Sequence, residues 1–133
     1  MKILVLAKYD QFHTVRPEAE IFISLSKIGY QITIMTKADY PYAKLFEKAG
    51  IKVIDFEAEK KLNNKEVNFI KKELNNGNYD VMHMFNNISM VNGLAAAKNV
   101  KITCVLYRGY SANVNWFDPT LYMKFLHPRA NFI

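Results

Sequence analysis

The sequence predicts an α/β protein whose parallel sheet is covered by helices on both faces. Short runs of β-forming apolar residues alternate along the 133-residue chain with segments whose apolar residues recur at helical spacing. Alternation of this kind implies right-handed crossovers between parallel strands. Half of the residues are apolar, and the length is that of a single domain with one continuous core.

The first half of the chain contains three expected strands and two expected helices. The strands are Lys2–Ala7, Gln31–Thr36 and Lys52–Phe56, and the shorter helix is Tyr40–Ala49, closed by Gly50. A loop is expected over 9–16 and a helix from Pro17 to Ile28, because proline is favoured at the first helical position. Glu18 and Glu20 would then lie at the positive end of the helix dipole, and Gly29 would stop the helix.

The second half repeats the pattern and ends in a less regular region. A charged linker, Glu57–Asn64, precedes a helix over 65–76 with a lysine-rich, solvated face and Gly77 after its end. The remaining expected elements are strands Val81–Met84 and Ile102–Leu106, a helix Ser89–Lys98, an aromatic segment Tyr107–Phe117, a helix from Asp118 to about Leu126, and a sixth strand Ala130–Ile133. Asp118 followed by Pro119 is typical of a helix N-cap.

Composition restricts the class of protein further. No apolar run approaches the roughly 20 residues that span a bilayer, and no secretory signal precedes the first strand, so a soluble, cytoplasmic protein is expected. Cys104 is the only cysteine and lies in a predicted buried strand, which indicates a free, packed thiol. The net charge of +6 favours an anionic partner such as a nucleotide, a phospholipid surface or nucleic acid.

Several kinds of chemistry lack their sequence signatures. The segment 7–12 after the first strand has no glycine, which disfavours nicotinamide and flavin dehydrogenases, and no phosphate-binding loop of the nucleotide hydrolases is present. His13, His83 and His127 lie in separate segments without further ligands at suitable spacing, so no metal site is expected.

Polar clusters follow two of the buried strands. Asn86 and Asn87 come after the expected strand Val81–Met84, and Arg108 and Gly109 come after the expected strand Ile102–Leu106. Because the carboxyl ends of parallel strands meet at one edge, where open α/β sheets bind ligands, we expect the functional site there.

Each of these clusters has a functional and a structural interpretation. Arg108 can present its planar fork to phosphate or sugar oxygens beside the aromatic ring of Tyr107, while Gly109 permits close approach; the alternative is a surface turn. Asn86 and Asn87 suit sugar hydroxyls, but asparagines also favour turns and helix caps.

Two further sets of residues are candidates for the site. The first expected loop brings Asp10, His13 and Arg16 towards the same edge, although an ordinary connection would contain such residues too. His83 either is a hydrogen-bonded core histidine or faces the ligand, where its ordinary pKa near 6.5 would let it orient or deprotonate a hydroxyl.

Three segments carry a resemblance to a known family. Lys2–Leu6 leads to a helix containing Glu18-Ala19-Glu20 and then to Gly29–Ile34; Asp80–Met84 follows an Asp-Val-x-His pattern; and Arg129–Ile133 is similar to the start of a strand that precedes a domain linker. In this order and spacing, the whole chain resembles the amino-terminal domain of a GT-B glycosyltransferase of family 4 of the retaining enzymes.

The resemblance implies a three-layer Rossmann-like domain with strand order 3-2-1-4-5 and an incipient sixth strand. It implies that residues 1–133 form the acceptor-side domain of a hexosyltransferase, inactive without a carboxyl-terminal donor-binding domain that this chain does not contain. No cofactor is implied, because the nucleotide-sugar is a co-substrate. The acceptor would be a glycan or a lipid-linked glycan, at a cytoplasmic location or at the inner face of an anionic membrane.

The resemblance also carries site residues over by position. His83 would be catalytic, and Asn86 and Arg108 would contact substrate. Phe85 and Arg108 stand where the family often has histidines. An alternative from a different class is a non-catalytic α/β module that binds a small ligand or an anion. Nucleic acid is not expected as a partner, because the basic residues are dispersed or lie on one helix face.

Overall fold

A computed structural model describes residues 1–108 and 117–133, and in this part of the chain five parallel strands form one sheet. The strands are β1 (Lys2–Leu6), β2 (Gln31–Thr36), β3 (Lys52–Asp55), β4 (Val81–Met84) and β5 (Thr103–Leu106). The helices are α1 (Phe12–Lys27), α2 (Pro41–Lys48), α3 (Asn64–Gly77), α4 (Asn87–Ala96) and the short 3₁₀ helix η1 (Pro119–Met123). The strand order β3-β2-β1-β4-β5 confirms the predicted fold class, with β1 at the centre of the sheet.

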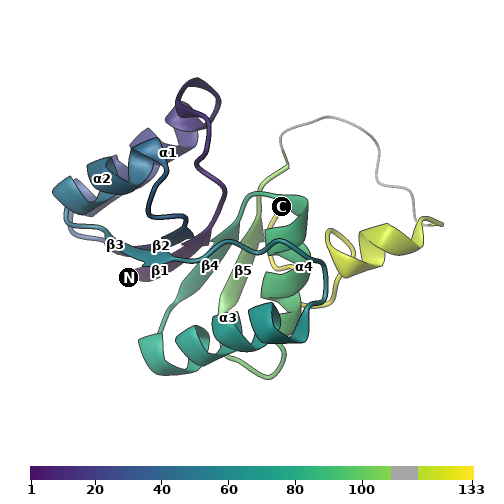
Figure 1. Cartoon of the computed structure of the whole chain (residues 1–133). Coiled ribbons are helices and arrows are strands. Elements are labelled where there is room, and N and C mark those ends of the chain that lie inside the picture. The colour runs from purple at the N-terminus through teal and green to yellow at the C-terminus, as the bar shows by residue number, and fades with distance from the viewer. Residues whose placement is uncertain (109–116) are drawn as a thin grey trace.

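The helices form a layer on each face of the sheet. α1 and α2 cover one face, and α3 and α4 cover the other (Figure 1). The alternation of side chains along β1 shows how one strand serves both layers, since Leu4 and Leu6 pack in the core under α3 and α4, whereas Ile3 and Val5 pack under α1 and α2. Two buried cores therefore hold the sheet between them.

The start of α1 differs from the sequence prediction. The helix begins at Phe12, not at Pro17, so the expected loop is shorter and Pro17 lies inside the helix. The ring of Phe12 stacks on that of Tyr42 in α2, with 4.8 Å between ring centroids. This packing holds the added upstream turn against α2, although Pro17 leaves one backbone hydrogen bond of the helix unmade. Glu18 and Glu20 consequently lie beyond the first turn, where the dipole effect is weak.

The other element boundaries agree with the prediction within a few residues. Gly29 and Gly50 have φ values of +103° and +80°, which confirms them as the stops of α1 and α2. After α3, the left-handed position is taken by Asn78, with φ +51°, and Gly77 is still helical. α4 begins at Asn87, two residues earlier than expected, because Asn86 caps it.

The carboxyl-terminal region is less regular than expected. Instead of a helix to Leu126, only the 3₁₀ turn of η1 forms, although Asp118 caps it as predicted by accepting from the Thr120 N–H at 2.9 Å. The expected sixth strand is a single parallel bridge between Val105 and Phe132. The Asn131 side chain substitutes for further pairing by accepting from the backbone N–H of Cys104 at 2.8 Å.

Two expectations from composition can be examined in the same structure. Cys104 is a free, buried thiol, as predicted, and burial raises its pKa. In the part of the chain that the structure describes, no helix has both the length and the apolar character that a bilayer crossing requires.

Candidate functional site

A crevice of about 680 Å³ opens at the carboxyl edge of the sheet. Its walls come from the segments that follow β1, β2, β3 and β4. The crevice therefore lies at the topological switch point, where β2 and β3 lie on one side of β1 and β4 and β5 lie on the other. The lining residues are Lys8, Lys37, Tyr40, Glu57, Ala58, Glu59, Lys61, Asn86, Asn87 and Ile88. Open parallel sheets bind ligands at such a switch point, because the loops part there.

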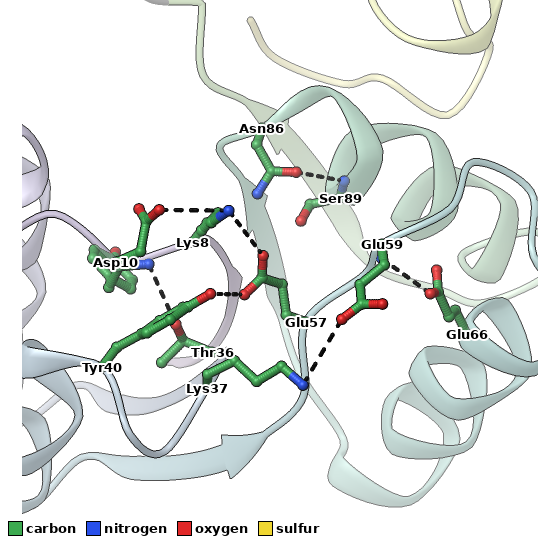
Figure 2. A network of polar contacts seen from close by, with 11 residues as sticks. Lys8, Asp10, Thr36, Lys37, Tyr40, Glu57, Glu59, Glu66, Asn86 and Ser89 are labelled. Carbon is green, nitrogen blue, oxygen red and sulfur yellow. Dashed lines mark hydrogen bonds and ion pairs between the residues drawn. The ribbon is translucent and has the colours of Figure 1, made fainter.

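Glu57 is the centre of the polar contacts in this crevice. Its carboxylate accepts a hydrogen bond from the Tyr40 hydroxyl and lies 3.6 Å from Lys8 Nζ, which is also 3.4 Å from Asp10 (Figure 2). The pKa of Lys8 is raised by Glu57 and, next, by Asp10, and the bond to Glu57 raises the pKa of Tyr40. Lys8 and Tyr40 therefore keep their protons and remain hydrogen-bond donors at neutral pH.

A second pair of opposite charges lies at the wall formed by the segment after β3. Lys37 Nζ lies 4.0 Å from Glu59 (Figure 2), and the side chain of Lys37 is partly and that of Glu59 largely exposed. Exposed pairs of this kind are held weakly, so their groups can exchange a protein partner for a ligand. The crevice thus offers both donors and acceptors of hydrogen bonds, a combination that suits the hydroxyl groups of a polyol.

The amino terminus of α4 forms the facing wall. The Asn86 side chain accepts from the Ser89 N–H at 2.8 Å, which is the N-cap interaction of α4. Asn87 Oδ1 accepts from Lys124 Nζ at 3.2 Å, and Lys124 is buried. The capping interpretation of Asn86 is therefore observed, while its contact with a ligand stays a prediction.

We expect Asn86→Ala to lower the free energy of unfolding by about 1 kcal/mol, because the Ser89 N–H loses its acceptor. Urea denaturation followed by circular dichroism measures this change. Asn86→Asp keeps an acceptor oxygen at the same place and is the matched control, with an expected change of no more than a few tenths of a kcal/mol. Equal losses in both variants would show that the loss does not come from the missing acceptor of the Ser89 N–H.

His83 lies away from this crevice, in a second hollow of about 260 Å³ on the α1 face of β4. Its ring stacks on Phe85 at 4.5 Å and meets Phe22 edge-on at 5.8 Å, and no hydrogen bond joins it to another described residue. Burial among these groups lowers its pKa to about 4, so the ring is neutral at pH 7. Tyr107 and Glu18 line the same hollow.

The other predicted site residues lie in different places. Asp10 reaches the crevice through Lys8, whereas His13 and Arg16 are exposed on the first turns of α1 and do not line it. The guanidinium of Arg108 lies 5.6 Å from the Phe125 ring centroid, and Lys124 Nζ lies at the same distance from that ring. Gly109 is outside the described residues. The structure thus brings Asn86 and Asn87 to one crevice, places Asp10 beside Lys8 of the same crevice, and places His83 and Tyr107 in another hollow.

Sequence reasoning did not single out the wall formed after β2 and β3. Lys37, Tyr40, Glu57, Glu59 and Lys61 belong to it. The signal for them was available, because they follow two predicted strands whose carboxyl ends share the edge of the sheet. Among residues 1–108 and 117–133, no three acidic, histidine or cysteine side chains gather where they could hold a metal ion.

Comparison with known proteins gives a family match over most of the chain. A family model described as glycosyl transferase 4-like matches residues 2–127. No curated protein sequence matches the chain. The match is therefore to a family model and not to an individual characterised sequence.

Solved structures share the fold at low sequence identity. A glycosyltransferase from Rickettsia africae superposes with a TM-score of 0.67 at 15% identity over 86% of this chain and 31% of its own. MurG from Acinetobacter baumannii gives 0.61 at 14% over 79% and 34%. HepE from Anabaena, solved in complex with UDP, gives 0.57 at 20% over 80% and 29%. The chain thus spans about a third of the length of each of these structures.

Proposed function

Since this chain belongs to the glycosyl transferase 4-like family, we propose that it is the acceptor-binding half of a glycosyltransferase. The observation that carries the proposal is the mixed-charge crevice at the carboxyl edge of the sheet, centred on Glu57. A crevice lined only by positive charges would favour a simple anion. This one pairs each type of donor with an acceptor, as the hydroxyl groups of a sugar require.

In the proposed reaction, an acceptor hydroxyl attacks the anomeric carbon of a nucleotide-sugar. The glycosidic bond forms, the bond from that carbon to the phosphate oxygen breaks, and the nucleoside diphosphate departs with the electron pair of this bond and takes up the proton that the hydroxyl loses. The residues of this chain bind and orient the acceptor: Glu57 accepts from one hydroxyl, while Lys8 and the Asn86 amide donate to others. Holding the reacting atoms close in this way lowers the entropic part of the barrier.

The donor would be bound mainly by a further domain, and this part of the proposal is supported by the longer chains of the similar structures. We propose a hexosyl donor, no cofactor, and an acceptor that is a glycan or a lipid-linked glycan. We also propose a cytoplasmic location at an anionic membrane surface, and the net charge of +6 supports attraction to such a surface. Without a donor-binding domain, the 133-residue chain is expected not to transfer sugar.

The test is a transfer assay with the full-length protein that contains this chain and its donor-binding domain. The assay compares the wild type with the variant Glu57→Gln. Radiolabelled UDP-glucose, UDP-galactose and UDP-N-acetylglucosamine serve as donors, and the octyl β-glycosides of the same sugars serve as acceptors. We expect Glu57→Gln to lower kcat/KM for the acceptor about tenfold or more, because a charged acceptor of hydrogen bonds is replaced by a neutral amide.

Glu47→Gln, on the exposed surface of α2, makes the same chemical change outside the crevice and should leave the rate unchanged. Equal activity of Glu57→Gln and the wild type would remove the crevice from the reaction. Binding of an octyl glycoside without transfer to it from any of the donors would instead support the non-catalytic binding module.

A further inference from the structure

A buried asparagine on α4 holds the loop that forms one wall of the crevice. Asn92 has no exposed surface, and its side chain bonds to the segment between β3 and α3 and to Glu66 at the start of α3. Its Oδ1 accepts from the Leu62 N–H at 2.6 Å, and its Nδ2 donates to the Lys60 carbonyl at 2.9 Å and to Glu66 Oε2 at 2.9 Å. A buried amide with three such bonds defines the position of the groups that it contacts.

Glu66, in the first turn of α3, completes the hold on this loop. Its Oε1 accepts from the Glu59 N–H at 3.0 Å, as Figure 2 shows, and its Oε2 accepts from the Lys60 N–H at 3.3 Å. The two side chains together satisfy the backbone N–H groups of residues 59, 60 and 62 and the carbonyl of residue 60. No strand or helix supplies these bonds, because the loop has no regular structure.

The backbone conformation of the loop also indicates that interactions with the rest of the protein hold the loop in place. Leu62 has a φ of +54°, in the left-handed region that a branched side chain normally avoids. A residue held there needs surrounding interactions to fix it. The short hydrogen bond from the Leu62 N–H to Asn92 is such an interaction.

The same helix therefore controls both walls of the crevice. The first residues of α4 line one wall, and Asn92, farther along the helix, fixes the segment 57–62 that lines the other. We propose that Asn92 and Glu66 are positioning residues that set the width of the crevice and place Glu57 and Glu59 for an acceptor. The kinetic part of this inference rests on the proposed function, whereas the placement of the loop does not.

Asn92→Asp is the informative substitution. It keeps the shape and the acceptor for Leu62 but loses both donated bonds, and it places a carboxylate against Glu66 and the Lys60 carbonyl. Glu66→Gln in the same chain returns a donor to this contact and restores the total charge. The two substitutions should therefore compensate each other in part, as residues in direct contact do. Asn68→Asp, exposed on α3, is the matched control.

The first measurement is hydrogen–deuterium exchange by mass spectrometry on the full-length protein without ligand. We expect Asn92→Asp to speed exchange of the amides in peptides covering 57–63 about tenfold, the change that loss of roughly one hydrogen bond produces. Peptides from β1 and α2 should keep wild-type exchange, and Asn92→Asp with Glu66→Gln should recover most of the protection. Unchanged exchange in 57–63, or an equal rise throughout the chain, would overturn the proposal.

The second measurement is the KM for octyl β-glucoside and for UDP-glucose in the same variants. We expect the acceptor KM to rise about tenfold in Asn92→Asp, with the donor KM unchanged and the double variant near wild type. Equal rises in both KM values would overturn the positioning role. If Asn92→Asp does not fold, Glu66→Gln alone tests the same exchange and KM values, since Glu66 lies nearer the surface.

A wild-type protein that transfers no sugar, but shows the predicted exchange pattern in the variants, would contradict the proposed function and support the placement of the loop.

Discussion

Gly93→Val is expected to lower the free energy of unfolding by about 3 kcal/mol, at the upper end of the cost of overpacking a core. Gly93 lies in α4 where the helix packs on the sheet, and a Cβ atom there would be 2.4 Å from Met84 Sδ and 3.4 Å from Leu6 Cδ2. Both neighbours are buried in the core and are enclosed by other side chains. Urea denaturation of the wild type and the variant measures the change.

Two companion variants separate the steric effect from helix propensity. Ala95→Val introduces a β-branched residue on the same helix at a partly exposed position and should cost no more than about 0.5 kcal/mol. Met84→Ala combined with Gly93→Val should cost less than the sum of the two single changes, because the shortened side chain leaves room. Additive effects, or a Gly93→Val variant as stable as the wild type, would contradict close packing at this contact.

The pH dependence of stability should reveal the environment of His83. Its pKa is about 4 in the folded protein, against about 6.5 in an unfolded chain, because burial disfavours the charged ring. Between these values the unfolded chain binds more protons, so this contribution is fully present above pH 6.5 and is lost as the pH falls towards 4. A fully buried histidine with this shift in pKa would lose more stability. Because the ring of His83 is half-buried, we expect the free energy of unfolding to fall by about 2 kcal/mol as the pH falls.

The measurement compares wild type with His83→Phe in urea at pH 7 and at pH 4.5. The variant keeps an aromatic ring against Phe22 and Phe85 but cannot titrate, so its stability should fall about 2 kcal/mol less over this interval. Glu18 lines the same hollow, and burial raises its pKa, which acts in the opposite direction but is common to both proteins. His13→Phe, at an exposed position, should behave as the wild type does. Parallel pH curves for wild type and His83→Phe would contradict a neutral, buried His83.

The central strands and their order were predictable because local and long-range signals agree there. Val81–Met84 follows Asp80 and precedes the segment Phe85–Asn87, and the structure has β4 with the same limits. The start of α1 was not predictable in this way. Pro17 is a strong local signal, but the stacking of Phe12 on Tyr42 joins residues from two elements and extends the helix past it.

The location of the candidate site at the carboxyl edge of the sheet was predictable from the sequence, but only some of its residues were. Asn86 follows a strand and does line the crevice, as the position of a strand end implies. Glu57 follows a strand as well, yet its sequence context is a charged linker that indicates a solvated surface. The role of Asn92 had no signal, because an asparagine in the middle of a helix is recognised as a structural residue only when the loop that it holds is seen in space.

The central position of β1 has a consequence for synthesis on the ribosome. One edge of β1 pairs with β2, which is complete at residue 36, whereas the other pairs with β4, whose last residue, Met84, lies opposite Leu6. At roughly 5–20 residues per second, about 2–10 s pass between completion of β2 and of β4. A nascent chain therefore presents an unpaired apolar strand edge for seconds, and the interval before residue 84 emerges is when chaperone binding or misassociation competes with folding.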